Sequence, residues 1–279
     1  MELKGKTAIV TGSSKGIGAG IALAFAREGA NVVVNSRKAA DGADMVGKIQ
    51  AAGGKALACG ADVSKKAEVE AMVAACVKQF GTVDILVNNA GIEAMPALLK
   101  DIPEEQWDRL MTVNLKSVFL CCQAVIPVMM KQNKGKIINI SSLAGRRMTF
   151  FGSADYTAAK HGVCGLTYHL AYELADSHIT VNAICPGAIM TPLMEEGTTP
   201  EYREMVVKRL IPLGRFGTTA DIAQAAIFFG SDRSDWITGQ LMDVDGGTMT
   251  GYGEDLRPLI RKRMADAQAA AAAKAAGKK

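Results

Sequence analysis

A tyrosine and a lysine four positions apart, Tyr156 and Lys160, have the spacing with the clearest chemistry in this sequence. Both fall in a helical pattern over about 155–177, where residues four apart share one face. The pKa of a free tyrosine, about 10, is too high for efficient proton transfer at neutral pH, and a neighbouring ammonium lowers it. The pair indicates a general acid and base for a carbonyl or alcohol oxygen, although a solvent-facing helix pair has the same spacing. Ser142, at the end of a predicted strand, is a hydroxyl that could reach the same pocket.

A glycine-rich turn follows the first predicted strand, Thr7–Val10, and reads TGSSKGIG from Thr11 to Gly18. Its glycines let the backbone turn tightly and let a pyrophosphate approach closely. The helix that starts at once offers free N–H groups and the positive end of its dipole to phosphates. No Gly-Lys pair followed by Ser or Thr closes the motif, so a P-loop is excluded. The position between a strand and a helix therefore favours a dinucleotide site.

The second predicted strand, Asn31–Asn35, leads into Ser36 and Arg37, and this junction bears on the choice of cofactor. Folds that prefer NAD place an acidic residue here, which accepts a hydrogen bond from the ribose 2′-hydroxyl and would repel a 2′-phosphate. Ser36 stands at that position, and Arg37 can bind a phosphate as a fork, with Lys15 on the glycine-rich turn. We therefore expect NADP(H), with NAD(H) as the alternative if Arg37 is only a solvated loop charge.

Short β-branched runs alternate with helical patterns along nearly the whole chain. This alternation predicts an α/β fold: a single Rossmann-like, doubly wound domain whose seven-stranded parallel sheet has helices on both faces. The expected strands are Thr7–Val10, Asn31–Asn35, Lys55–Cys59, Val83–Val87, Lys136–Ile140, Ile179–Ile184 and Gln240–Val244. The expected helices include one N-capped by Ser64, a long one over about 104–130, one over about 155–177, a short one within 191–210 and one over about 219–230.

The 279 residues carry 32 Lys and Arg against 28 Asp and Glu, a net charge of +4. Residues 254–279 hold seven basic and three acidic side chains, so the body is neutral and the excess charge belongs to the tail. A neutral body argues against a broad nucleic-acid-binding face. No apolar run approaches the roughly 20 residues that a membrane-spanning helix needs, and no signal-peptide pattern precedes the first strand. We expect neither a nucleic acid nor a membrane as a partner.

Six cysteines without C-x-x-C spacing and three histidines without ligand spacing predict neither a disulfide framework nor a metal site. Small reduced cysteines are typical of a cytoplasmic protein, which is the location that we expect. We divide the chain into a catalytic dinucleotide-binding domain, 1–253, with a substrate lid over about 188–215, and a basic Ala- and Lys-rich extension, 254–279. The apolar stripe from Leu256 to Met264 in this extension is expected to dock on a neighbouring subunit or to edge the substrate cleft.

The chain resembles the short-chain dehydrogenase/reductase family from residue 5 to about residue 250. The matching motifs, in chain order, are Thr11–Gly18, Asp62-Val63, Asn88–Gly91, Asn114, Ser141-Ser142, Tyr156–Lys160, Asn182–Gly187 with Thr191, and Asp243–Gly247. So many ordered matches at consistent spacing are specific, whereas any single one would not be. Within the family, the pattern is most similar to 3-oxoacyl reductases and small-alcohol dehydrogenases.

The resemblance implies that Tyr156 passes the proton, that Lys160 lowers the tyrosine pKa and binds the nicotinamide ribose, and that Ser142 hydrogen-bonds the substrate oxygen. It implies that Asn114 holds a water linking Lys160 to solvent. Hydride then passes directly between cofactor and carbon, without a metal. The implied cofactor-binding residues are Gly12, Ser14, Lys15, Gly16, Ile17, Gly18, Ser36, Arg37, Asp62, Val63, Asn89, Ala90, Gly91, Tyr156, Lys160, Pro186, Gly187, Ile189 and Thr191.

The residues expected around the substrate indicate a largely apolar pocket. They are Glu93, Met95, Leu143, Arg146, Arg147, Met148, Met190 and Met194. Each apolar member is by default a core residue, so its place in the pocket is an open alternative. Arg146 and Arg147 are candidates for a cationic rim that grips a carboxylate or phosphate, or for a subunit contact.

We expect an NAD(P)(H)-dependent oxidoreductase that interconverts a secondary alcohol and a ketone. One alternative is a reductase of 3-oxoacyl thioesters of CoA or a carrier protein, or the corresponding 3-hydroxyacyl dehydrogenase. Another is a catalytically idle cofactor-binding subunit of a hetero-oligomer. The resemblance also implies a homo-oligomer, a tetramer or dimer, that forms through the two long helices. The apolar residues that fit this shared face are Val118, Phe119, Val125, Val163 and Leu166.

Overall fold

A computed structural model describes residues 1–93, 97–149, 152–251, 261–262 and 265 of the chain. Met95 and the stripe residues Leu256, Leu259, Ile260 and Met264 lie outside the described residues, so what we expect of them stays a prediction. The chain divides into two compact units, Met1–Gly197 with Gly217–Asp245, and Thr198–Phe216 with Gly246–Lys279. The first unit holds the whole sheet and every candidate catalytic residue.

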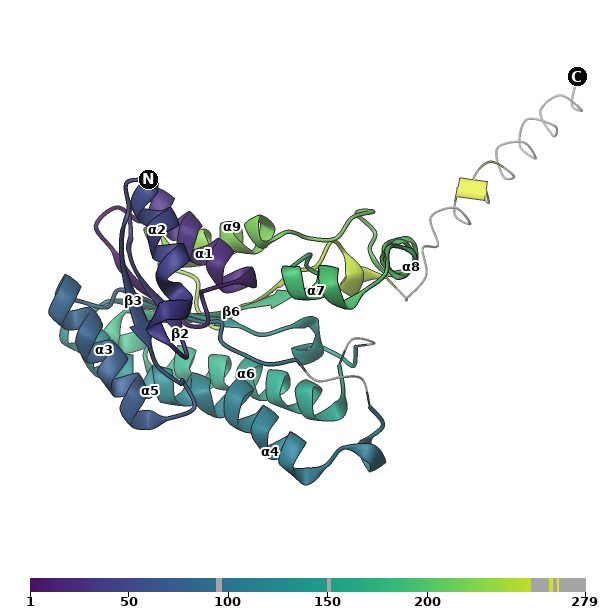
Figure 1. The fold of residues 1–279 in the computed structure, drawn as a ribbon, viewed down its shortest axis with the longest axis horizontal. Coiled ribbons are helices and arrows are strands. Elements are labelled where there is room, and N and C mark those ends of the chain that lie inside the picture. The colour runs from purple at the N-terminus through teal and green to yellow at the C-terminus, as the bar shows by residue number, and fades with distance from the viewer. Residues whose placement is uncertain (94–96, 150–151, 252–260, 263–264, 266–279) are drawn as a thin grey trace, which may run out of the picture. The chain divides into compact units, whose positions relative to one another are not determined.

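The sheet of the first unit has seven strands in the order β3-β2-β1-β4-β5-β6-β7, all parallel (Figure 1). The strands are β1 (Thr7–Val10), β2 (Asn31–Ser36), β3 (Lys55–Gly60), β4 (Ile85–Asn88), β5 (Gly135–Ile140), β6 (Ile179–Pro186) and β7 (Leu241–Val244). Successive side chains enter cores on opposite faces: in β1, Ala8 and Val10 face one core and Ile9 the other. Burial on both faces explains the continuous apolar runs of the sequence, and the predicted α/β doubly wound fold is confirmed.

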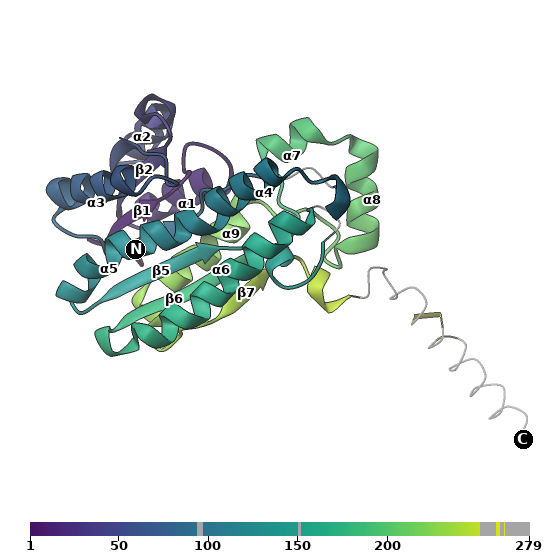
Figure 2. The ribbon, with the colours of Figure 1, turned by 90° about the horizontal axis from the view of Figure 1, so that it is seen from below.

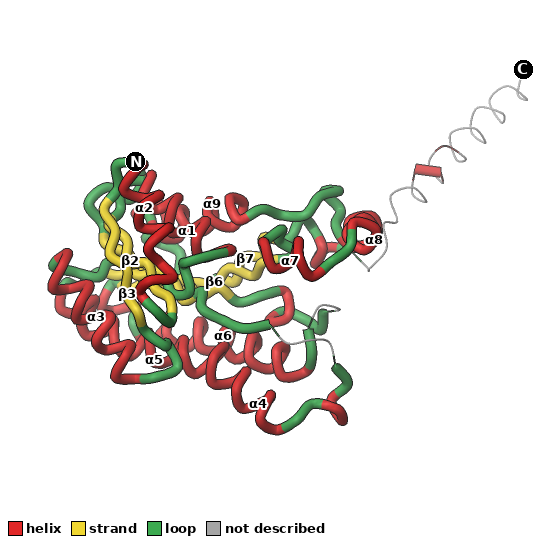
Figure 3. Tube along the Cα trace, in the orientation of Figure 1, coloured by secondary structure: helices red, strands yellow, loops and turns green. Residues whose placement is uncertain are grey.

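Helices cover both faces of this sheet, which Figure 3 shows as yellow strands between red helices. One face carries α1 (Gly16–Arg27), α2 (Ala43–Ala51) and α9 (Thr219–Gly230), and the other carries α3 (Lys66–Phe80), α5 (Ser117–Lys131) and α6 (Ala154–Glu173). The shorter α4 (Glu104–Met111) packs on α6, and α7 (Pro192–Gly197) follows β6. The second unit contains α8 (Pro200–Leu210).

Two helix starts differ from the prediction. Ser64 does not cap α3, because its hydroxyl donates to Asp62 Oδ1 at 2.7 Å and the helix begins at Lys66. Residues 191–210 form two helices, since Thr199 caps a second one by accepting from the Tyr202 N–H at 3.2 Å. The expected lid, 188–215, therefore includes residues of both units, and its closure stays a prediction.

The segment from Glu104 to Lys131 is continuously helical, with the π-helical segment η3 (Thr112–Lys116) between α4 and α5 (Figure 2). By length and composition alone it is apolar enough to cross a membrane, whereas the sequence predicted no such segment. A core helix that packs against a sheet can be equally long and apolar, and 44% of the most apolar 18-residue stretch of this helix is buried in the structure. Its apolar character therefore follows at least in part from packing under the sheet.

Three residues expected on an oligomer face are instead part of the core. Val118, Val125 and Val163 are at most 4% exposed and pack between the helices and the sheet, so this expectation is wrong for them. Phe119, by contrast, is 46% exposed. The sequence pattern could not distinguish the core-facing side of α5 from its exposed side, because this helix is apolar over most of its circumference.

The carboxyl ends of the parallel strands lie at one edge of the sheet, and the direction of winding reverses between β1 and β4. Ligands of doubly wound folds bind outside this edge at such a reversal. The glycine-rich turn follows β1, Asn89 follows β4 and Ser142 follows β5. The fold therefore brings the motifs of the sequence to a single region.

Candidate active site

The glycine-rich turn leaves room in front of the N-terminus of α1. Gly16 has a φ of +62°, and a Cβ added there would meet no heavy atom within 4 Å. The first backbone bond of the helix runs from Ala19 N to Lys15 O at 3.3 Å. The N–H groups of Gly16, Ile17 and Gly18 precede it and have no acceptor within the helix. This open, positively polarised end fits the diphosphate of a nicotinamide dinucleotide.

Two asparagines fix the shape of this turn. Asn89 Nδ2 donates to the main-chain oxygens of Thr11 at 2.9 Å and Gly12 at 3.1 Å. Asn35 Oδ1 accepts from Gly12 N at 3.2 Å, while its Nδ2 donates to Ala61 O at 3.0 Å. Asn89 is among the predicted residues, but Asn35 was missed. The available signal was an amide side chain directly after the apolar run of three valines in β2.

The residues expected to select the cofactor lie at the end of β2 and on the turn. Ser36 is buried, and its hydroxyl donates to the main-chain oxygen two residues later at 2.8 Å. Arg37 and Lys15 are exposed. A hydrogen bond from Ser64 is the main cause that lowers the pKa of Asp62, and the Arg37 charge adds to it. Arg37 therefore acts electrostatically on the loop after β3, where Asp62 is expected to flank the adenine.

The remaining cofactor candidates lie at the carboxyl end of a strand or on the loop that follows it, at this same edge. They are Ser14, Val63, Ala90, Gly91, Pro186, Gly187, Ile189 and Thr191. Gly187 N donates to Val244 O at 3.0 Å, which ties the end of β6 to β7. Thr191 Oγ1 accepts from Met194 N at 3.2 Å and so caps α7. Their contacts to a dinucleotide stay a prediction.

Ser142, Tyr156 and Lys160 meet between the end of β5 and the first turns of α6. The Ser142 side chain lies close enough to the Tyr156 hydroxyl to lower its pKa as a hydrogen-bond donor. Ser142 Oγ also accepts from Ala144 N at 3.1 Å, which fixes its position. Lys160 Nζ donates to Ile140 O at 2.9 Å and lies 5.6 Å from the centroid of the Tyr156 ring. The helix thus places both residues of the Tyr-Lys pair on the side that faces the strand end.

The pKa of Tyr156 moves in the direction opposite to the prediction. Burial raises it to about 12; the hydrogen bond from Ser142 lowers it and the Glu93 carboxylate raises it. Burial also lowers the pKa of Lys160 to about 8. Desolvation therefore outweighs the ammonium effect inferred from the spacing. At neutral pH Tyr156 is a neutral phenol, which is the form that donates a proton.

Asn114 is 1% exposed and lies in η3. Its Oδ1 accepts from Ile92 N at 2.7 Å, and its Nδ2 donates to Ile92 O at 2.8 Å. These two bonds fix the loop after β4, which carries Asn89 and Gly91. The structure thus gives the Asn114 side chain a role in holding this loop, and the expected water stays a prediction.

The expected substrate residues differ in their surroundings. Arg146 forms a two-point ion pair with Asp243, with Nε–Oδ1 at 3.0 Å and Nη2–Oδ2 at 3.4 Å, so its charge is compensated. Leu143 is buried, whereas Met148 is 78% exposed. Glu93 and Arg147 are exposed, and Met190 and Met194 are half-buried. The compensated Arg146 weakens the case for a cationic rim.

The glycine-rich turn, which fits a diphosphate, lies at the same edge of the sheet as Ser142, Tyr156 and Lys160. This combination indicates a nicotinamide-dependent oxidoreductase. Comparison with known proteins agrees. A family model described as enoyl-(acyl carrier protein) reductase matches residues 12–249. The chain is 45% identical over 243 residues to 3-oxoacyl-(acyl-carrier-protein) reductase FabG of Staphylococcus epidermidis, covering 87% of this chain and 98% of the relative.

Two further relatives act on steroids, by their names. The chain is 46% identical over 254 residues to 3beta-hydroxysteroid dehydrogenase 1 of Eggerthella lenta, covering 90% of this chain and 96% of the relative. The structure matches that of a 7α-hydroxysteroid dehydrogenase in complex with NADH and 7-oxo glycochenodeoxycholic acid, with a TM-score of 0.84 and 37% identity over 88% of this chain and 95% of that one. The chain belongs to the short-chain dehydrogenase/reductase family. It is therefore a dehydrogenase or reductase of alcohol and ketone groups, and its cofactor class is NAD(P)(H).

Proposed function

We propose that this enzyme interconverts a secondary alcohol and a ketone with NADP(H), and that Tyr156 transfers the proton. The approach of the Ser142 side chain to the Tyr156 hydroxyl, with Lys160 Nζ 5.6 Å from the ring, carries the proposal. In this arrangement the Ser142 hydroxyl, a hydrogen-bond donor, and the Tyr156 phenol, an acid, can both reach the substrate oxygen on which negative charge develops during reduction.

The bound nicotinamide supplies or accepts the hydride. In reduction, the substrate carbonyl oxygen takes the proton of the Tyr156 phenol while Ser142 donates a hydrogen bond to the same oxygen. Lys160 stabilises the phenolate that is left, and solvent returns the proton. In oxidation, the same groups act in reverse, so Tyr156 must first lose its proton. Asn114 keeps the loop after β4 in place through its two bonds to Ile92.

The cofactor preference is proposed from Arg37 and Lys15, which are exposed and carry the charge that a 2′-phosphate needs. Arg37→Ala is expected to lower kcat/KM for NADPH about tenfold, because a charge-assisted hydrogen bond contributes on the order of 1.5–3 kcal/mol. The value for NADH should change little. Lys38→Ala, which removes the neighbouring exposed charge, is the control. An unchanged NADPH/NADH ratio in Arg37→Ala would remove this residue from cofactor selection.

The substrate proposal is an uncharged ketone, because Asp243 compensates the charge of Arg146, one of the two arginines predicted to form a cationic rim. A 3-oxoacyl thioester is the second candidate, since a 45% identical relative is named for that activity. A panel of a 3-ketosteroid, a cyclic ketone and an acetoacetyl thioester, each with NADPH and NADH, tests the proposal by nicotinamide absorbance. Higher kcat/KM on the thioester would favour the second candidate. No turnover of any member, with cofactor bound, would favour an idle subunit.

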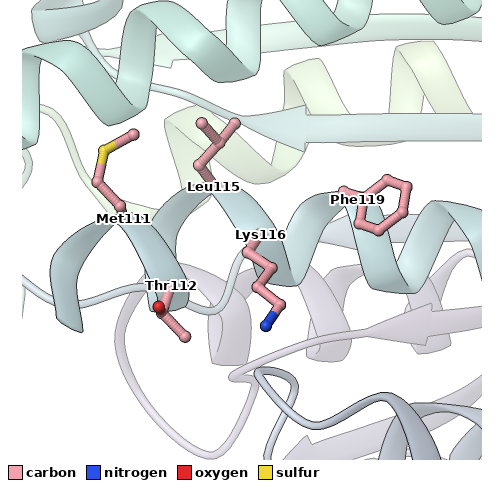
Figure 4. A pocket seen from close by; sticks show the side chains of 5 residues that line it. All are labelled: Met111, Thr112, Leu115, Lys116 and Phe119. Atoms are coloured by element: carbon pink, nitrogen blue, oxygen red, sulfur yellow. The ribbon is translucent and has the colours of Figure 1, made fainter. Parts of the chain in front are cut away.

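A homo-oligomer is proposed from an apolar groove on the long helix, lined by Met111, Thr112, Leu115, Lys116 and Phe119. Figure 4 shows Met111 and Leu115 on one side of the helix and Thr112 and Lys116 on the other. We assign the groove to a second copy of this chain. An antiparallel crossing centred near Thr112 sets the exposed Asp108 of one copy against the exposed Lys116 of the other, so the contact is self-complementary in charge.

Phe119→Arg is expected to halve the mass in solution, because a charge in the groove cannot be buried without a partner. Light scattering after size-exclusion chromatography measures this mass. Trp236→Arg is the control, as it places the same charge on a fully exposed aromatic residue elsewhere. Dissociation by Trp236→Arg alone would move the contact away from the groove.

We also propose a cytoplasmic location, since all six cysteines are free and five of them are buried. The division into a catalytic domain, 1–253, and an extension, 254–279, rests on the change of composition in the sequence. Cell fractionation tests the first proposal, and truncation after Gly253 tests the second.

A further inference from the structure

Asp155 is a fully buried carboxylate directly before Tyr156, and the proposed reaction does not use it. Its Oδ1 accepts a hydrogen bond from the Ser153 hydroxyl and another from Tyr156 N at 2.8 Å. Its Oδ2 accepts from Gln106 Nε2 at 2.9 Å. Ser153 is the N-cap of α6, yet its side chain makes no capping bond to the helix. Asp155 takes over that function for the first turn.

These contacts stabilise the charged form of Asp155. Burial alone would raise the pKa of this carboxyl, but hydrogen bonds from Ser153, Gln106 and the Tyr156 amide together lower it. The N-terminal end of α6 favours a negative charge as well. A buried ion of this kind is costly unless every contact is made, so its place is tightly defined.

The contacts hold Tyr156 at several points. The Tyr156 N–H is one of the first-turn groups without an acceptor in the helix, and Asp155 supplies that acceptor. At the other end, the Ser142 side chain lies close to the hydroxyl and lowers its pKa. The ring is confined beside Gly152, where an added Cβ would lie 3.0 Å from Tyr156 Cδ1. Gln106 connects Asp155 to α4, 49 positions away in sequence.

We infer that Asp155, held by Gln106 of α4, is a positioning residue that sets the Tyr156 side chain for proton transfer. The inference rests on the proposed role of Tyr156. A shift of the phenol by a fraction of an ångström changes the donor geometry at the substrate oxygen without touching the glycine-rich turn. The expected signature is a loss in kcat with little change in the KM for NADPH.

Four variants of the full chain separate this role from a structural one. Asp155→Ala removes all three acceptor contacts. Asp155→Asn keeps Oδ1 for Ser153 and Tyr156, and the Gln106 amide can turn to accept from the new Nδ2. Gln106→Glu sets two carboxylates face to face, and the double variant Gln106→Glu/Asp155→Asn restores a donor and an acceptor. Asp176→Ala, the same change at an exposed site beyond α6, is the control.

The assay follows the panel ketone that the unaltered chain reduces fastest, with NADPH, beside thermal unfolding of each variant. We expect Asp155→Ala and Gln106→Glu to lower kcat about ten- to a hundredfold, with KM for NADPH within about twofold of the unaltered value. Asp155→Asn should stay near the unaltered kcat, and the double variant should recover most of what Gln106→Glu loses.

Unchanged kcat in Asp155→Ala, or no recovery in the double variant, overturns the inference. Parallel losses in kcat, cofactor KM and unfolding temperature would also overturn it, since they indicate a purely structural role. Tyr156→Phe in the same series keeps the two proposals apart. If Tyr156→Phe is active, the proposed role of Tyr156 in proton transfer fails. If Tyr156→Phe is inactive but Asp155→Ala keeps its activity, only the positioning role of Asp155 fails.

Discussion

Replacing Tyr156 with phenylalanine is expected to lower kcat for ketone reduction by about 10²–10⁴-fold, the usual contribution of a positioned acid. The change removes one oxygen and leaves the ring, which packs beside Gly152. The lost polar interaction of the hydroxyl with Ser142 should change the free energy of unfolding by no more than about 1 kcal/mol. KM for NADPH should stay within a few-fold, because the turn that binds the diphosphate is untouched. Steady-state kinetics with both substrates varied measures the effect.

The pH dependence gives a second readout of the same variant. With the pKa of Tyr156 raised to about 12, the phenol stays protonated from pH 6 to 9. Reduction should therefore fall in this range only as Lys160, whose pKa is about 8, loses the proton that lets it stabilise the phenolate. Oxidation needs the phenolate, whose fraction grows tenfold per pH unit below the pKa, so oxidation should rise with pH. Tyr156→Phe should lose this rise. Tyr172→Phe, the same change at a 90% exposed position of α6, should behave like the unaltered chain. Full turnover by Tyr156→Phe would rule out the proposed proton transfer.

The fold was predictable because the central strands β1, β4, β5 and β6 are buried on both faces. Runs such as the one in β1 are short, β-branched and apolar, and a helical pattern follows nearly every one of them. Right-handed crossovers account for the helices on both faces of the sheet. The sequence could not show which side of the long helix faces the sheet. Val118 and Phe119 are both apolar neighbours, yet the first is 4% exposed and the second 46%.

The position of the site was predictable, but its electrostatics were not. Spacing placed Tyr156 and Lys160 on one side of a helix, and the structure does so. The direction of the Tyr156 pKa depends on burial, which spacing does not reveal. Arg146 reads as a free cation until Asp243, 97 positions later, is seen to bind it. Asp155 and Gln106 were missed for the same reason, since their contact joins segments 49 positions apart.

Gly18→Ala is expected to damage both the fold and cofactor binding, because no space exists for the added methyl group. A Cβ at Gly18 would lie 2.4 Å from Asn89 Nδ2 and 2.5 Å from Gly12 O. These two atoms form the 3.1 Å hydrogen bond that holds the glycine-rich turn to the loop after β4. Separating them should lower the free energy of unfolding by about 1–3 kcal/mol. If the turn opens at a similar cost, the dissociation constant for NADP rises about tenfold for each 1.4 kcal/mol.

Gly47→Ala is the matched control, and its effect should have the opposite sign. Gly47 lies within α2, is exposed, and an added Cβ would meet nothing within 4 Å. Alanine there should raise the free energy of unfolding by roughly 0.5–1 kcal/mol, because glycine is the poorer helix former. Urea unfolding with and without NADP distinguishes the two variants. Gly18→Ala should be less stable and gain less from NADP, whereas Gly47→Ala should be more stable and gain as much as the unaltered chain. Equal stabilisation of both variants by NADP would show that the close contact at Gly18 does not shape the cofactor site.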